Sequence, residues 1–136
     1  MTLKDILNSK PSKIITCNVN CIVADAISVM DAKGVGSILV YDDHKKLAGI
    51  FTERDIMKCF VRNISFTNEV MARIMTPNPL VLDSSTDVSV AMNMMSERKF
   101  RHLPVSENGE IIGVISYRDL VSHILPGIIY MTGDSY

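Results

Sequence analysis

Short apolar runs alternate with amphipathic segments along the chain, and this order occurs twice. In the first half, apolar residues at helical spacing predict a helix over 23–33, which ends at Gly34. The β-rich runs 37–41 and 47–51 flank a polar stretch and predict a β-hairpin. Apolar residues then return to helical spacing over 53–61, which predicts the helix that closes this half.

The second half repeats the order of the first. Runs of strand type and helix type follow one another with nearly the same spacing. The predicted elements are a strand at 80–82, a helix at 88–97, hairpin strands at 103–106 and 111–115, and a helix at 117–125.

A similar lead-in segment precedes each half. Residues 3–8 predict a short helix, and the related segment 72–79 comes before the second half, so the duplication includes the lead-in. A strand at 13–17 follows the first lead-in, and Asn20 is expected to cap the helix 23–33. The polar segment 62–69 has no periodicity and is interpreted as the linker between the halves.

Each half therefore has the order β-α-β-β-α, which predicts an α/β (α+β) fold. A unit of about fifty residues buries too little surface to be stable alone. We expect the two halves to pack sheet against sheet about a pseudo-twofold axis, with a cleft between them. The predicted boundaries are 1–66 for the first motif with its lead-in, 67–125 for the second motif, and 126–136 for a C-terminal tail.

One octet recurs in register where each hairpin ends. It is Gly49-Ile50-Phe51-Thr52-Glu53-Arg54-Asp55-Ile56 in the first half and Gly113-Val114-Ile115-Ser116-Tyr117-Arg118-Asp119-Leu120 in the second. A hydroxyl residue followed three positions later by an acid is typical of a capping box. Each octet therefore predicts a strand that continues directly into a helix.

The same residues could bind a phosphate and a sugar. A helix N-terminus offers backbone N–H groups and the positive end of the helix dipole, both of which suit an anion. The hydroxyl of Thr52 or Ser116 could add a hydrogen bond, and the carboxylate of Asp55 or Asp119 could accept both hydroxyls of a ribose. Side chains alternate along a strand, so an apolar residue that could support a base shares the face of each hydroxyl. These apolar residues are Ile50 and Val114.

Composition narrows the classes of partner. The chain has 136 residues, a net charge of −1, 6% aromatic residues and no Trp, which gives no case for nucleic acid or an anionic membrane. It contains no apolar run long enough for a transmembrane helix and no signal-peptide core near Met1. Its three cysteines show no disulfide framework, which favours a reducing cytoplasm.

The two octets, the element order and two hairpin strands together carry a family resemblance. The strands are Gly36-Ser37-Ile38-Leu39-Val40 and Arg101-His102-Leu103-Pro104-Val105. In these features the chain resembles the tandem cystathionine-β-synthase (CBS) domain pair, or Bateman module, over residues from about 3 to 125. The resemblance implies a disc-like module that binds AMP, ADP, ATP or S-adenosylmethionine in clefts between its two motifs.

The resemblance also implies roles for particular residues. The hydroxyls of Thr52 and Ser116 would face phosphate, and Asp55 and Asp119 would hold ribose. Residues at the start of the middle strand of each half often reach phosphate in this family; the matching residues are Gly36 and Ser37 in the first half and Lys99, Arg101 and His102 in the second. Pro104, on the same strand as His102, is a further ligand-binding candidate. The basic strand of the second half is expected to approach the octet of the first, which would make the cleft of Thr52 and Asp55 the better phosphate site.

Other chemistry has little support in the sequence. The pair Cys17 and Cys21 lacks a second pair of metal ligands, and the histidines are scattered, so no metal site is expected. There is no phosphate-binding glycine loop, dinucleotide fingerprint or nucleophile-elbow motif, so no catalytic residue is assigned.

The sequence thus predicts a stand-alone cytoplasmic CBS pair that senses an adenosine-containing ligand without a further cofactor. We expect it to form a homodimer through its helices and to act on an unknown effector protein. Two alternatives stay open. One is a structural dimerisation or protein-interaction module in which the octets only cap helices. The other is a nucleotide-hydrolysing enzyme.

Overall fold

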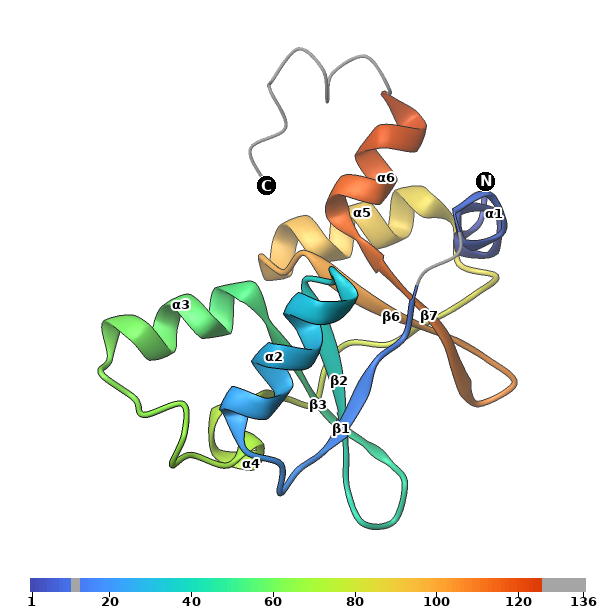
Figure 1. Ribbon diagram of the computed structural model, residues 1–136. Helices are drawn as coiled ribbons and strands as arrows, with labels where there is room; N and C mark the ends of the chain where they lie inside the picture. Colours follow the sequence, from blue (N-terminus) through green and yellow to red (C-terminus); the bar gives the residue numbers. More distant parts are fainter. Residues whose placement is uncertain (11–12, 126–136) are drawn as a thin grey trace. The chain divides into compact units, whose positions relative to one another are not determined.

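Figure 1 shows the computed structural model, which describes residues 1–10 and 13–125. These residues form short helices and two small sheets. The α/β fold class and the β-α-β-β-α order of each half are confirmed. The predicted tail at 126–136 lies outside the described residues. In chain order the elements are α1 (Leu3–Ser9), β1 (Thr16–Asn18), α2 (Val23–Lys33), β2 (Ser37–Tyr41), β3 (Leu47–Thr52), α3 (Glu53–Val61), α4 (Met71–Ile74), β4 (Thr76–Pro77), β5 (Leu82–Asp83), α5 (Val88–Arg98), β6 (His102–Glu107), β7 (Glu110–Ser116) and α6 (Tyr117–Ile124).

The chain forms two compact units that do not follow the sequence repeat. One is Ile14–Pro79, and the other joins the described parts of Met1–Lys13 and Leu80–Tyr136. The lead-in helix of the first repeat, α1, thus belongs to the unit of the second repeat. The strand β4, which precedes the second repeat, pairs with β3 in the unit of the first. Each unit is therefore completed by the segment that precedes the other repeat.

The unit Ile14–Pro79 contains a four-stranded sheet in the order β1-β2-β3-β4. Strand β1 runs parallel to β2, while β3 is antiparallel to both β2 and β4. The apolar face of α2 packs on one face of the sheet. Its core residues are Val23, Ala26, Met30, Ile38, Val40, Phe51 and Met71.

The start of α2 corrects one sequence prediction. Its N-cap is Ile22, not Asn20, and the N-cap side chain makes no hydrogen bond. Instead, the N–H groups of Val23 and Ala24 donate to the carbonyls of Glu69 and Phe66, at 3.0 and 2.9 Å. The segment interpreted as a linker thus supplies backbone acceptors that replace a side-chain cap.

Some strand bounds also differ from the prediction. Strand β1 was expected at 13–17 but covers Thr16–Asn18, because its pairing partner on β2 begins at Leu39. The strand expected at 80–82 is β5, Leu82–Asp83, which pairs with Val105 and Ser106. Both shifts follow from pairing with a middle strand, a non-local contact that local composition does not encode.

The other unit has the sheet order β5-β6-β7, covered by helices α1, α5 and α6. The side chain of Asp87 caps α5 through a 2.9 Å hydrogen bond from the N–H of Ser89. Helix α1 contributes three of the ten buried residues in this core, and the second repeat contributes the others. The buried residues are Leu3, Ile6, Leu7, Val88, Ala91, Met95, Leu103, Val105, Ile115 and Leu120.

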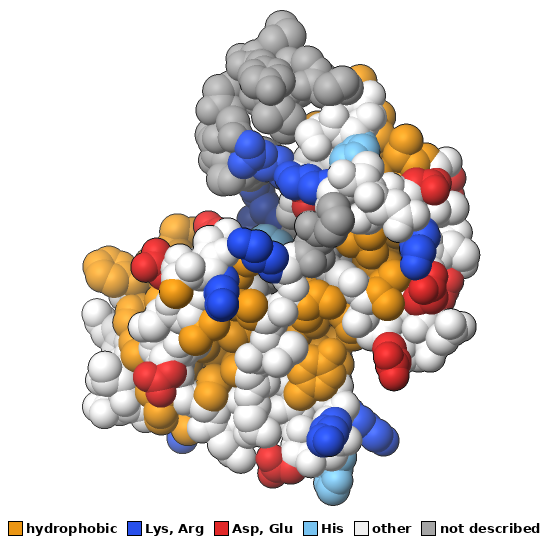
Figure 2. All heavy atoms as spheres, turned by 45° about the vertical axis from the view of Figure 1, so that its right-hand side comes forward, with side chains coloured by type: hydrophobic (Ala, Val, Ile, Leu, Met, Phe, Trp, Pro, Cys, Tyr) orange, Lys and Arg blue, Asp and Glu red, His pale blue; other side chains and the backbone are white. Residues whose placement is uncertain are grey.

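Apolar side chains also reach the surface, as the face in Figure 2 shows. On α3 the side chains of Met57, Phe60 and Val61 are 61%, 76% and 73% exposed. Among the described residues, no helix is long and apolar enough to cross a bilayer.

Candidate functional site

Both octets form the strand-to-helix junction that the sequence predicts. Strand β3 ends at Thr52, the N-cap of α3, and β7 ends at Ser116, the N-cap of α6. The N–H of Thr52 donates to Asp55 Oδ2 at 2.9 Å, and the N–H of Ser116 donates to Asp119 Oδ2 at 3.2 Å. Both copies therefore form a capping box, and the residues that cap the helices are the same ones proposed to bind a ligand.

Strand pairing places further candidate residues beside each hydroxyl. Ser37 lies opposite Thr52 between β2 and β3, and His102 lies opposite Ser116 between β6 and β7. The residue before each of them accepts a hydrogen bond from the first residue of the helix. The two bonds run from Glu53 N–H to the Gly36 carbonyl, at 3.2 Å, and from Tyr117 N–H to the Arg101 carbonyl, at 2.7 Å.

The apolar candidates lie on the sheet face away from the helix-packed core. Phe51 and Ile115 belong to the cores of their units, so the neighbouring residues Ile50 and Val114 point to the opposite face. Pro104 pairs with Val114 and is buried, while Ile50 is buried and Val114 half-buried. Each octet hydroxyl thus shares a face with an apolar residue, as the alternation along the strand predicts.

The carboxylate of Asp55 is nearly buried, with 7% of the residue exposed, and has neutral partners. Its Oδ1 accepts the hydroxyl of Thr76 at 3.3 Å, and its Oδ2 accepts the N–H and the hydroxyl of Thr52 at 2.9 and 3.4 Å. Thr76 lies on β4, which the sequence did not predict as a strand. The only sequence signal for this segment was the similarity of residues 72–79 to the lead-in residues 3–8.

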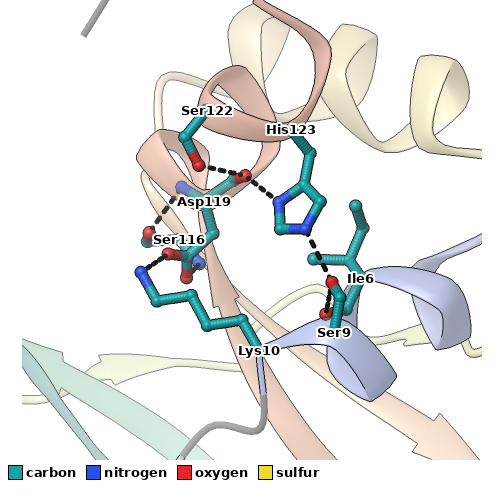
Figure 3. Close-up of polar contacts among 7 residues, drawn as sticks. All are labelled: Ile6, Ser9, Lys10, Ser116, Asp119, Ser122 and His123. Carbon is teal, nitrogen blue, oxygen red and sulfur yellow. Dashed lines mark hydrogen bonds and ion pairs between the residues drawn. The ribbon is translucent and has the colours of Figure 1, made fainter. Parts of the chain in front are cut away.

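Asp119 instead has a charged partner from a distant part of the chain. Lys10 Nζ lies 2.9 Å from Asp119 Oδ1, as Figure 3 shows, and the carboxylate side chain is 22% exposed. Partial burial by itself would raise the pKa of Asp119, but hydrogen bonds from Lys10 and Ser116 outweigh it and hold this pKa below its ordinary value. Lys10 follows α1, and nothing in the sequence pattern pairs it with Asp119.

The end of α1 is attached to α6 beside this ion pair. His123 Nδ1 donates to the backbone carbonyl of Asp119 at 3.0 Å, and its Nε2 lies 2.6 Å from Ser9 Oγ. The Asp119 carbonyl also accepts the hydroxyl of Ser122 at 3.0 Å. Figure 3 shows these contacts on one side of α6, next to Lys10. They connect the residue before Lys10 to the helix that carries Asp119.

The lowered pKa of Asp119 predicts a pH-dependent stability. A carboxyl group whose pKa falls on folding stabilises the folded state above its ordinary pKa of about 3.9, and this contribution is lost as the pH falls through the lowered value. We expect Asp119→Asn to reduce the free energy of unfolding near neutral pH by about 1 kcal/mol. The difference from the wild-type protein should vanish at low pH.

Urea unfolding at several pH values measures this difference. Asp31→Asn is the matched control, because Asp31 is an exposed acid on α2. A deficit of the Asp119→Asn variant that stays constant from neutral to acid pH would contradict the assignment.

Cys17 is a poor candidate for a redox-active or metal-binding thiol. Burial and, to a smaller extent, a hydrogen bond with the thiol of Cys21 raise the pKa of Cys17 to about 12. Cys17 is therefore protonated at neutral pH, and the thiolate is the form that binds metals and attacks electrophiles. Within residues 1–10 and 13–125, no three His, Cys, Asp or Glu side chains gather as metal ligands.

Comparison with known proteins identifies related chains. The model of the family described as CBS domain matches residues 2–62 and 70–126. A CBS domain-containing protein of Arabidopsis thaliana, CBSCBSPB2, is 35% identical over 105 residues, which are 76% of this chain and 20% of that protein. The chain spans about a fifth or less of the length of several such curated relatives.

Solved structures resemble the fold over nearly its whole length. A putative signal-transduction protein with CBS domains from Burkholderia ambifaria has a TM-score of 0.85 and 37% identity, covering 93% of this chain and 95% of that one. The CBS domain pair of protein MJ0100, in complex with 5′-methylthioadenosine and S-adenosyl-L-methionine, has a TM-score of 0.79 and 25% identity. It covers 94% of this chain and 98% of that one.

Proposed function

Because this chain belongs to the CBS domain family and contains two CBS motifs in tandem, we propose that it is a regulatory module that binds an adenosine-containing ligand through its two octets. The observation that carries the proposal is the pair of capping boxes. In both copies a hydroxyl, a carboxylate and a helix N-terminus occur together beside an apolar residue. The complex of the related MJ0100 pair with two adenosine-containing molecules supports the same class of ligand.

Each group in the octet has a distinct task in this proposal. Thr52 and Ser116 bind phosphate with the N–H groups of the helix they precede. Asp55 and Asp119 accept the ribose hydroxyls, because a carboxylate has more acceptor sites than its cap uses. The remaining candidates line the bound ligand: Ile50, Val114 and Pro104 contact the base, while Gly36, Ser37, Arg101 and His102 contact the phosphate.

Binding would act on a partner through a shift in conformational populations. A ligand that contacts one conformation better than another shifts the equilibrium by the difference in affinity. No nucleophile and no positioned water are needed for this function, so the chain would act as a sensor and not as an enzyme. The enzyme alternative predicts product formation from ATP, which chromatography of the incubated nucleotide would detect.

Exposed apolar residues on α3 favour a second function that is compatible with the first. Met57, Phe60 and Val61 place three large apolar side chains on one short helix. Such a surface suits contact with another protein, either a second copy of the chain or an effector. If ligand binding is absent, this interaction module becomes the better interpretation of the fold.

Thermal unfolding with added ligands tests the proposal. The ligands are AMP, ADP, ATP, S-adenosylmethionine, NAD and GTP, of which GTP tests selectivity for adenine. A ligand present at about 100 times its dissociation constant stabilises the folded state by about 2.7 kcal/mol. For a chain of this size we expect the midpoint to rise by roughly 10 °C.

Variants of the two acids identify the octet that binds. Asp55→Asn and Asp119→Asn should each remove the part of the shift that comes from its own octet, while the exposed Asp31→Asn should keep the whole shift. Equal shifts in all three variants would exclude both octets. No shift with any ligand would exclude the sensor and leave the interaction module.

A further inference from the structure

The two octets share their residues but differ in the charge beside the acid. Asp55 accepts hydrogen bonds from two threonines, Thr52 and Thr76, and no charged group is among these partners. Asp119 accepts hydrogen bonds from Ser116 and from the ammonium group of Lys10. The difference therefore comes from the segments that pack beside the octets, because one brings Thr76 and the other brings Lys10.

The backbone of Lys10 is held in place by the packing of α1, while its side-chain ammonium group is exposed and able to move. The preceding helix α1 buries Leu3, Ile6 and Leu7, and Ser9 contacts His123 of α6. The side chain of Lys10 is 66% exposed, so its flexible four-carbon stem is able to move the ammonium group away from Asp119. The positive charge thus stays close to the octet whether or not the ion pair is formed.

A ribose that binds Asp119 has to compete with Lys10. The ammonium group occupies Oδ1, and Ser116 already donates to Oδ2, so two ribose hydroxyls would have to displace the lysine from Oδ1. A neutral nucleoside would break the ion pair without offering the lysine a new partner. A phosphorylated nucleoside would offer its phosphate as a replacement, and this exchange keeps both charges paired.

We propose that Lys10 sets the charge preference of the Asp119 octet, acting as a movable counter-ion that admits phosphorylated adenosine ligands and disfavours neutral or cationic ones. This inference rests on the proposed function, since it concerns the ligand class of one of the two octets. In the described part of the chain the hydrogen-bond donors to Asp55 are Thr52 and Thr76, so its octet does not depend on Lys10. Removal of Lys10 would then change the ligand preference of the Asp119 octet and leave that of the Asp55 octet unchanged.

Calorimetric titration of AMP, ATP and adenosine into the full chain and its Lys10→Met variant tests the proposal. We expect loss of the ammonium group to weaken the binding of AMP and ATP at one site about tenfold, because a charge-assisted hydrogen bond is lost. Adenosine should bind this variant as tightly as, or more tightly than, the wild-type protein, because no ion pair has to be broken. The preference for phosphorylated ligands should therefore fall in Lys10→Met.

Two further variants separate this role from a structural one. Lys10→Arg keeps the charge and should keep the preference for AMP over adenosine. Lys13→Met removes an exposed lysine three residues further on and should change neither affinity.

The outcomes distinguish the two levels of the proposal. If the wild-type protein binds AMP and adenosine but Lys10→Met changes both affinities equally, or neither, then the role of Lys10 is wrong while the ligand-binding function stands. If neither AMP, ATP nor adenosine binds the wild-type protein, both are wrong. A rise in the salt dependence of AMP binding on removal of Lys10 would also contradict a counter-ion.

Discussion

Replacing Phe51 with alanine is expected to lower the free energy of unfolding by about 3–5 kcal/mol, the cost of removing a large aromatic side chain from a packed core. Phe51 is completely buried, with 0% of its surface exposed, and packs in the core of the unit Ile14–Pro79. It lies between Ile50 and Thr52 in the octet. The Phe51→Ala variant should therefore be less stable and should also lose ligand binding at that octet.

Phe60 provides a matched control for this prediction. It carries the same side chain nine positions later on α3 but is 76% exposed. We expect Phe60→Ala to change stability by less than about 0.5 kcal/mol, as is usual for surface substitutions. Chemical denaturation of both variants measures the difference. Similar losses for Phe51→Ala and Phe60→Ala would mean that the apolar face of α3 is covered or that the core is misassigned.

The second large effect is expected at Gly49, where β4 pairs with β3 at close distance. A Cβ atom at this position would lie 2.5 Å from the Met75 sulfur and 2.8 Å from the Thr76 carbonyl oxygen. Because one of these neighbours is backbone, a side-chain rotation alone cannot relieve the contact. We expect Gly49→Ala to cost about 2–3 kcal/mol and to move Thr76 away from Asp55.

Two comparisons isolate the cause of that loss. Gly34→Ala changes a glycine with a φ of +66° and nothing within 4 Å of the added Cβ, so it should cost only about 1 kcal/mol of backbone strain. Adding Met75→Ala to Gly49→Ala removes the sulfur contact but not the carbonyl contact, so it should not restore the wild-type stability. Denaturation midpoints give both values, and a Gly49→Ala variant as stable as Gly34→Ala would refute the close approach.

Elements with strong local signals were predicted well. Helix α2 and helix α3 have the predicted bounds, and the hairpin β2–β3 differs only by Thr52. In these segments the side-chain period and the turn residues agree with the fold, so local and tertiary preferences coincide. The N-cap of α2 and the position of β1 were wrong because distant backbone groups determine them.

The recurring octet identified the candidate residues in the sequence, but it did not predict how the surroundings of the two octets differ. Asp55 and Asp119 occupy equivalent positions in the two octets, which makes them indistinguishable by pattern. Their surroundings differ because Thr76 and Lys10 come from segments outside the octets. Lys10 is separated from Asp119 by 109 positions, and no local rule connects them.

The amino-acid sequence by itself determined the duplicated order of elements, the two capping boxes and the faces on which Ile50, Thr52, Val114 and Ser116 lie. These features depend on side-chain periods of two and 3.6 residues and on hydrogen bonds across three positions. Only the tertiary structure decided which lead-in segment completes which unit, and hence that a lysine contacts one carboxylate and a threonine the other. The reason is that each small repeat needs a further segment to cover its apolar face. Which segment packs there depends on contacts between residues far apart in the sequence, which local patterns do not encode.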